Sequence, residues 1–310
     1  MRNHPLFGVK ASLLASLAAI FAVALCPRVS GESVDGVEAV NSRVASDYVR
    51  ARTADGHLVP EYYSFGKGGV WGGPIADESV DHMGFLEVAH VIAPALASEK
   101  YLPASDPAKT KLLIMVYWGT TGVSESLSNS AAVANYQSAA NNPDLTSTNY
   151  FIKNDAMAQM SEALTMLSIS NRQRDQTDFK NAAMLGYDSE GTIGTDYGRY
   201  ISHTALGTRA KDDVAEIEMN RYFVVLMAYD FQLLWKDKKH KLLWETRFSI
   251  NEGHNRFDHA LPVLSQYASQ YFGQPTNGLQ RSRVLDGKVE IGAPTMVQFM
   301  DEPKDKDAKK

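Results

Sequence analysis

The chain has 310 residues, of which 44% are hydrophobic, and its formal net charge is −5. This composition is ordinary for a globular chain, and the length allows one large domain or two small ones. Without the three basic side chains of residues 1–31 the net charge becomes −8, which argues against a general nucleic-acid binder.

The first 31 residues have the pattern of a secretory signal peptide. Arg2 and Lys10 belong to a short basic stretch, and an uncharged apolar run follows over 11–25. Val29 and Gly31 then occupy the −3 and −1 positions of a cleavage site. We therefore expect this leader to be removed and the protein to be periplasmic or extracellular, with the remaining chain as one α+β domain.

Other interpretations of the leader stay open. Ala22 and Ala24 offer a weaker cleavage site. An uncleaved anchor needs about 20 apolar residues, whereas this run is shorter and Pro27 ends it. A lipid anchor through Cys26 is disfavoured because Leu25 is bulkier than the small residue of a lipobox. Because Cys26 is the single cysteine, a chain cleaved after it has no disulfide and no thiolate. No later stretch is long enough to span a membrane.

The region before the first clear element is polar and irregular, which predicts a linker over 32–60 and a domain over 61–285. A first strand is expected at 61–65 and a glycine-rich turn at 66–73. A helix follows, and Pro94 should kink or shorten it. Its apolar residues recur at three- and four-residue spacing: Phe85, Ala89, Ile92 and Leu96.

An insertion over 119–220 is expected to divide the domain. Before it, the apolar run 111–118 is typical of a strand covered on both faces. Within it, the stretch 120–148 is rich in Ser, Asn, Ala and Thr and predicts a long mobile loop.

Helices should fill the rest of this insertion. Asn154 or Asp155 can cap the first, and a second over 175–185 should stop at Gly186. An irregular segment and a polar helix near 212–220 complete the insertion. The apolar stripe of the first helix is Met157, Met160, Leu164 and Leu167.

The last part of the domain shows the clearest periodicity. A strand is predicted over 222–235, a charged turn over 236–241, and a second strand from Leu242, in which apolar residues alternate with polar ones to give one buried and one mostly wet face. This pair predicts an antiparallel hairpin. A helix follows and stops at Gly273, and 286–310 is expected to be mostly disordered. The buried stripe of that helix is Phe257, Leu261, Leu264, Ala268 and Phe272.

This order of elements predicts an α+β fold in which helices lie on one face of a mainly antiparallel sheet. It resembles small exported bacterial α+β domains of the lipoprotein type, whose function is not known. The resembling features are 62–65 as first strand, the helix ending at Lys100 and Tyr101, the strand 112–118, and 241–244 before the final helix. The resemblance covers under half of the chain and implies a fold and a compartment.

Two local patterns look catalytic but do not match their templates. The glycines of 66–73 lack the Lys-Ser or Lys-Thr pair of a phosphate-binding loop, and Trp71 stands where a dinucleotide-binding fingerprint needs glycine. Ser64 and Lys67 match the S-x-x-K nucleophile motif, but its K-T-G and S-D-N partners are absent. We therefore interpret the glycines as a turn and the S-x-x-K pattern as a chance match.

The best polar constellation is the pair His254 and Asp258, which would share one helix face, with His259 and Asn251 nearby. Acid–base work or metal binding is conceivable there, although Asp258 is more economically explained by the helix N-terminus that it supports. A second group, Asp77, Asp81 and His82, has the same simple explanation as first-turn residues.

The remaining candidates have structural explanations. The basic turn 236–241 could touch an anionic surface, but a solvated turn is favoured. Trp118, Trp235 and Trp244 are assigned to the core rather than to sugar stacking.

These patterns identify no catalytic residue, cofactor or metal site. We expect a non-enzymatic binding or assembly module of the cell envelope, whose partner is an envelope protein or polymer. The insertion would carry its ligand surface, because binding surfaces concentrate on loops held by a scaffold. The alternative is an exported hydrolase with a site assembled from His254, Asp258 and Asp81.

Overall fold

The computed structural model describes residues 36–71, 73, 76–122, 130–187 and 205–284. The chain divides into two units, 1–31 and 32–310, and all described residues belong to the second. The expected signal peptide with Cys26 and the expected tail 286–310 lie outside the described residues.

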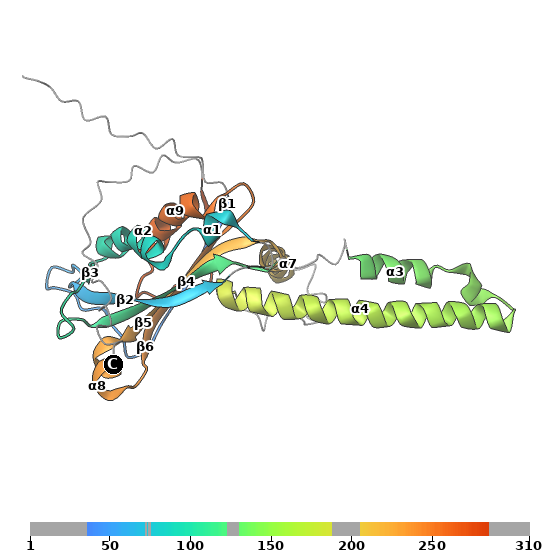
Figure 1. The fold of residues 1–310 in the computed structure, drawn as a ribbon, viewed down its shortest axis with the longest axis horizontal. Coiled ribbons are helices and arrows are strands. Elements are labelled where there is room, and N and C mark those ends of the chain that lie inside the picture. Colours follow the sequence, from blue (N-terminus) through green and yellow to red (C-terminus); the bar gives the residue numbers. More distant parts are fainter. Residues whose placement is uncertain (1–35, 72, 74–75, 123–129, 188–204, 285–310) are drawn as a thin grey trace, which may run out of the picture. The chain divides into compact units, whose positions relative to one another are not determined.

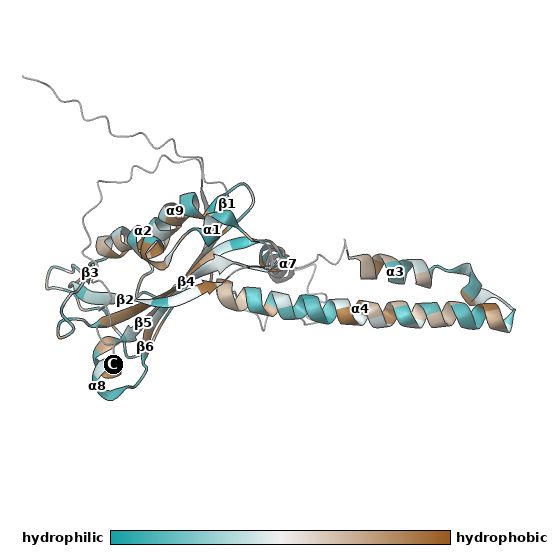
Figure 2. Ribbon diagram, in the orientation of Figure 1, coloured by the Kyte–Doolittle hydropathy of each residue, from teal (hydrophilic) through white to brown (hydrophobic). Residues whose placement is uncertain are grey.

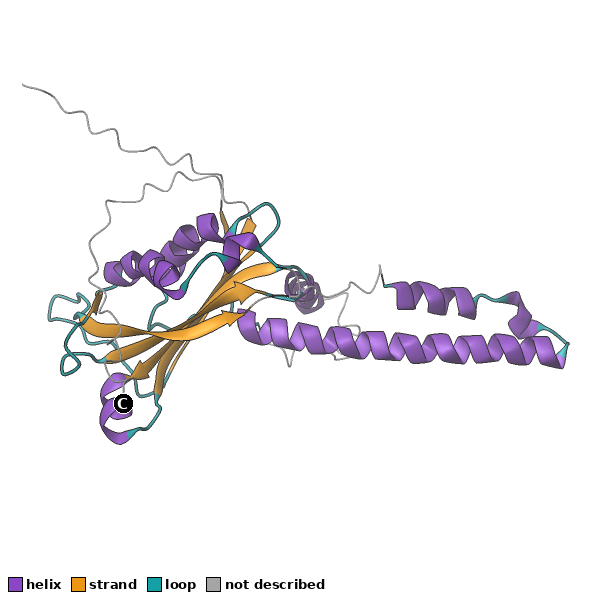
Figure 3. Ribbon diagram, in the orientation of Figure 1, coloured by secondary structure: helices purple, strands orange, loops and turns teal. Residues whose placement is uncertain are grey.

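A single seven-stranded sheet organises this unit, in the order β3-β2-β4-β5-β6-β1-β7 (Figures 1 and 3). The β3–β2 and β2–β4 pairs are parallel and the other four pairs are antiparallel, so the predicted mainly antiparallel α+β fold is confirmed. The strands are β1 Gly36–Val44, β2 Glu61–Trp71, β3 Tyr101–Pro103, β4 Leu112–Thr120, β5 Arg221–Asp230, β6 Leu242–Asn251 and β7 Gln280–Val284.

Helices α1, α2 and α9 lie together over one face of the sheet (Figure 3). Most of the predicted stripes of α2 and α9 are buried there, with Ile92, Leu96, Leu261 and Leu264 fully covered, whereas Phe85 is half-buried. The predicted helix stop at Gly273 is wrong, because α9 ends at Ser269 and the buried Phe272 lies in the turn that follows. α2 continues past Pro94, which lies inside the helix on its exposed side, so the predicted shortening does not occur. The helices are α1 Glu78–Asp81, α2 Phe85–Ser98, α3 Ala131–Ala140, α4 Tyr150–Leu185, α7 Ala205–Glu218, α8 Phe231–Asp237 and α9 Phe257–Ser269, with a 3-10 turn η2 at Pro143–Thr146.

The second face of the sheet is partly covered as well, by the C-terminal end of α4 and by α7. Leu185, Ile217 and Phe223 are buried in this smaller core. Consequently Glu245 and Ser249 of β6 are 8% and 0% exposed, so the predicted wet face of that strand is wrong. The reason is that the insertion supplies the C-terminal end of α4, which packs on β6 beside Arg247, and Ile217 of α7, which packs on the same face.

The predicted linker 32–60 is wrong over 36–44, because β1 lies inside the sheet between β6 and β7. Ala39 and Val40 of β1 are opposite Ser249 and Phe248 of β6, and both are fully buried. Polar residues between these apolar ones obscure the pattern, and the strands that pair with β1 lie about 200 residues or more further along the chain.

The predicted glycine-rich turn is also wrong, because β2 continues through it to Trp71. A Cβ at Gly68 would lie 2.7 Å from the ring of Tyr117 on β4, and a Cβ at Gly66 would collide with Met115. These glycines therefore make room for the side chains of the neighbouring strand. The ladder has a bulge between Lys67 and Gly69.

The described part of the insertion is mostly helical, and the predicted irregular segment 187–207 lies largely outside the described residues. The predicted mobile loop contains α3 and η2, and the two predicted helices are one, α4, which Asn149 caps. At 36 residues α4 is about 54 Å long. It ends at Gly186, as predicted, with a left-handed φ of 82°. We call α3, η2 and α4 the arm (Figure 1).

The last part of the predicted strand 222–235 is wrong, since β5 ends at Asp230 and α8 follows. The Asp230 side chain accepts a hydrogen bond from the backbone N–H of Leu233 and caps this helix. The antiparallel pairing of β5 with β6 is confirmed. None of the helices within the described residues combines the length and apolar character needed to cross a membrane.

Candidate functional site

The two predicted polar groups meet where α1 packs against the first turn of α9. His82, at the end of α1, places Nε2 3.6 Å from Oδ2 of Asp258 on α9. Arg256 donates two hydrogen bonds to the same carboxylate. The fold therefore brings together Asp258 and the imidazole of His82, which are far apart in the sequence.

The central side chain of this group, Asp258, is a carboxylate paired with Arg256. Burial tends to raise the pKa of Asp258, but the hydrogen bond from Arg256 and the charges of His259 and Arg256 outweigh it, so the pKa is lowered. His254 and Asp81 are exposed and are not bonded to this carboxylate. An ionised carboxylate at a helix N-terminus is a stabilising arrangement and a poor proton donor.

A buried network lies behind this surface group, and the sequence pattern did not reveal it as a network. The Tyr222 hydroxyl donates to Oδ2 of Asp77 at 2.6 Å, and the Ser79 hydroxyl donates to Oδ1 at 2.6 Å. The backbone N–H of Phe257 donates to Ser79 Oγ at 3.0 Å. Asp77 also caps α1, as predicted for a first-turn acid. These bonds join α1, β5 and α9, so the network has a structural role.

The S-x-x-K match has no catalytic geometry. Ser64 and Lys67 lie on β2, where residues three apart point to opposite faces of a strand. The Ser64 hydroxyl donates to the backbone oxygen of Ala104. The interpretation of this motif as a chance match is consistent with these positions.

Of the three tryptophans assigned to the core, two are buried and one is exposed. Trp118 and Trp244 are 2% and 1% exposed and belong to the core, as predicted. The assignment of Trp235 to the core is wrong, since it lies on α8 and is 48% exposed. The basic turn after α8 is tied back by an ion pair between Lys241 and Asp47.

Charged groups are buried at several other places. Glu61 is 3% exposed and accepts a hydrogen bond from the Tyr48 hydroxyl. Arg221 is 1% exposed and donates to Ser249. Glu38 is 2% exposed, and its Oε1 has no hydrogen-bond partner in the described chain. Within the described residues no group of three or more His, Cys, Asp or Glu side chains could hold a metal ion.

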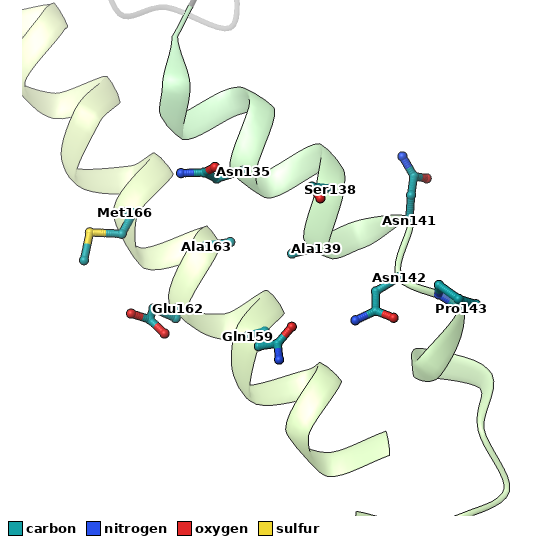
Figure 4. Close-up of a pocket in the computed structure, with 10 residues that line it drawn as sticks. All are labelled: Asn135, Ser138, Ala139, Asn141, Asn142, Pro143, Gln159, Glu162, Ala163 and Met166. Carbon is teal, nitrogen blue, oxygen red and sulfur yellow. The ribbon is translucent and has the colours of Figure 1, made fainter. Parts of the chain in front are cut away.

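A polar groove of about 680 Å³ runs between α3 and α4 on the arm (Figure 4). Asn135, Ser138 and Ala139 come from α3, and Asn141, Asn142 and Pro143 from the turn that follows it. Gln159, Glu162, Ala163 and Met166 form the α4 wall. Side-chain amides offer both donors and acceptors, so this groove suits an uncharged polar polymer or a peptide backbone.

The arm also carries exposed apolar side chains on α4, and the ribbon of this helix alternates between hydrophobic and hydrophilic residues along its length (Figure 2). More than half of the exposed large hydrophobic side chains of the described chain are on this helix: Tyr150, Phe151, Ile152, Met157, Leu164, Met166, Ile169 and Phe179. Of the predicted stripe, Met160 and Leu167 are half-buried, whereas Met157 and Leu164 are exposed. A second hollow, of about 430 Å³, lies beside Leu164 and Arg172.

No protein-family model matches this chain, and no curated protein is similar to it. One solved structure with similarity is a PDZ domain protein from Parabacteroides distasonis, at 13% sequence identity and a TM-score of 0.33. The match covers 81% of this chain and 40% of that one. A likeness of this size carries no conclusion about the fold or the site, which rest on the residues described above.

Proposed function

We propose that this chain is a non-enzymatic binding or assembly module of the bacterial cell envelope, and that the arm is the surface that contacts its partner. The carrying observation is that α4 packs on the sheet only near its C-terminal end, where Asp178, Asn181, Ala182 and Leu185 are buried. Earlier in the helix, Ala156 is the buried residue. Most of the helix therefore contributes little to the sheet's core.

The arm presents two kinds of surface at once. One is the polar groove, and the other is the apolar stripe Tyr150, Met157 and Leu164, which are seven residues apart and share one side of α4. Exposed apolar patches rimmed by polar residues mark interaction sites. An envelope protein or a polar envelope polymer is the proposed partner, and the signal-peptide pattern supports a periplasmic or extracellular location.

The alternative, an exported hydrolase, would use His254, Asp258 and Asp81. The geometry favours it less, because Asp258 is paired with Arg256 and His82 while the other two candidates are exposed. Loss of a hydrolytic activity in Asp258→Asn, with folding unchanged, would reverse this preference.

A shortened arm tests the proposal. Ser130 Oγ lies 3.5 Å from Ser170 Oγ, so 131–169 can be replaced by two glycines that join neighbouring points. The shortened protein should keep a cooperative unfolding transition and lose crosslinking to its envelope partner. The matched control is Trp235→Ala, which removes an exposed apolar side chain outside the arm and should leave crosslinking unchanged.

Two results would contradict the proposal. One is unchanged partner capture by the shortened protein, and the other is unfolding of the sheet on removal of the arm. The location is tested by cell fractionation and N-terminal sequencing, which should find a protein that begins after Gly31 outside the cytoplasm. An intact leader on cytosolic protein would refute export.

A further inference from the structure

Strand β2 has an open edge beyond the end of β3. On that side β3 pairs only with Glu61, Tyr62 and Tyr63, whereas on the other side β4 accompanies β2 from Tyr63 to Trp71. Beyond Tyr63, no residue of the described chain pairs with the outer side of β2. Because β2 follows β3 in the strand order, this segment forms the margin of the sheet (Figure 1).

The hydrogen bonds show which residues face outward. The N–H of Glu61 donates to Lys100 and the carbonyl of Tyr63 accepts from Ala104, both on the β3 side. The carbonyl of Tyr62 accepts from Lys111, on the β4 side. Since backbone groups alternate along a strand, those of Phe65 and Lys67 face outward, up to the bulge between Lys67 and Gly69.

Unpaired backbone groups at a strand edge determine which kind of ligand can bind there. A row of N–H and C=O groups at strand spacing is completed by another extended polypeptide, which adds to the sheet. Val70 and Trp71, 52% and 55% exposed, lie at the end of the same strand and offer apolar contact. We infer that the outer edge of β2 at Phe65 and Lys67 is a strand-addition site for a short, acidic, extended segment of a partner protein.

The charge and the bulge restrict the occupant. The exposed Lys67 side chain favours a carboxylate on the added strand. A second copy of this chain would bring two Lys67 side chains to the same short edge, which is unfavourable. The open edge is interrupted by the bulge between Lys67 and Gly69, and a bulge and a lysine also limit uncontrolled edge pairing, so the added segment should be short. This site lies outside the arm and does not depend on the function proposed for it.

The test selects peptides on the purified protein from a phage library of random eight-residue sequences. We expect enrichment of β-branched and aromatic residues alternating with Asp or Glu. A synthetic copy of an enriched peptide should slow hydrogen exchange at the amides of Phe65 and Lys67. Lys67→Pro removes an outward N–H and should weaken binding at least tenfold, while Lys67→Gln, the backbone control, should weaken it by less than that.

A third variant keeps the test decisive if Lys67→Pro fails to fold. Lys67→Glu should select basic instead of acidic peptides, and shortening of the arm should leave selection unchanged. The inference is overturned by the absence of any enrichment, by equal binding to Lys67→Pro, or by enrichment only after deletion of 285–310, which would make the chain's own tail the occupant. A dimer that Lys67→Pro dissociates would identify a second copy instead.

Discussion

The buried carboxyl of Glu38 should make this protein less stable as the pH rises through neutrality. Glu38 lies on β1 on the same strand face as Val40, and it is 2% exposed. Burial raises its pKa from 4.5 to about 7. Burial and Tyr271 raise the pKa of the Tyr267 phenol on α9, and the charge of Glu38 raises it further. The Tyr267 phenol is therefore a neighbour of Glu38.

The size and sign follow from the two pKa values. The folded protein keeps the proton of Glu38 up to about pH 7, whereas the unfolded chain releases it near 4.5. The folded state therefore binds more protons between these values, and the free energy of unfolding falls as the pH rises. The difference corresponds to about 3 kcal/mol at pH 8.

The perturbation is Glu38→Gln, which keeps the shape and removes the charge. Urea unfolding should show the variant gaining about 3 kcal/mol relative to the natural protein between pH 4.5 and pH 8. Glu162→Gln, at an exposed position of α4, is the matched control for loss of a carboxylate. A difference between the Glu38 variant and the natural protein that is constant across this pH range would refute a raised pKa at this position.

Three further outcomes can be measured by urea unfolding. Gly186→Ala should cost more than about 2 kcal/mol, because the left-handed φ of 82° is combined with a neighbouring side chain 2.7 Å from the new Cβ. Gly56→Ala, with a φ of 83° and open space, should cost only about 1 kcal/mol, and equal costs would contradict the steric explanation. Tyr222→Phe should cost about 1–3 kcal/mol, because it removes the 2.6 Å hydrogen bond to Asp77; an unchanged midpoint would show that this bond contributes nothing. Asp258→Asn should cost about 0.5–1 kcal/mol at pH 7, since the ionised carboxylate is held by Arg256 at a helix N-terminus. Because its pKa is lowered on folding, this contribution is lost as the pH falls below the ordinary value of 3.8, and a cost that persists in acid would contradict it.

The candidate site could be anticipated only in pieces. Asp258 and His82 were each recognisable as first-turn or helix-end residues, but their contact depends on α1 packing against α9. The carboxylate network of Asp77 includes Tyr222, which lies 145 residues away. No local spacing encodes such a contact, since a tertiary neighbour can lie at any distance along the chain.

The elements predicted from the sequence are those whose pattern is complete within one segment. The stripe of α9 and the left-handed stop at Gly186 depend on short-range geometry, so residue types alone indicate them. Tertiary structure decided the rest. The polar strand β1 forms because β6 and β7 complete its hydrogen bonds. The segment with Gly66 and Gly68 is extended because it pairs with β4, whose Met115 and Tyr117 fill the space that the glycines leave. Likewise, the second face of β6 is covered because the end of α4 returns to the sheet beside Arg247 and Arg221 of β5 contacts Ser249, and this kind of burial depends on neighbours that are remote in sequence.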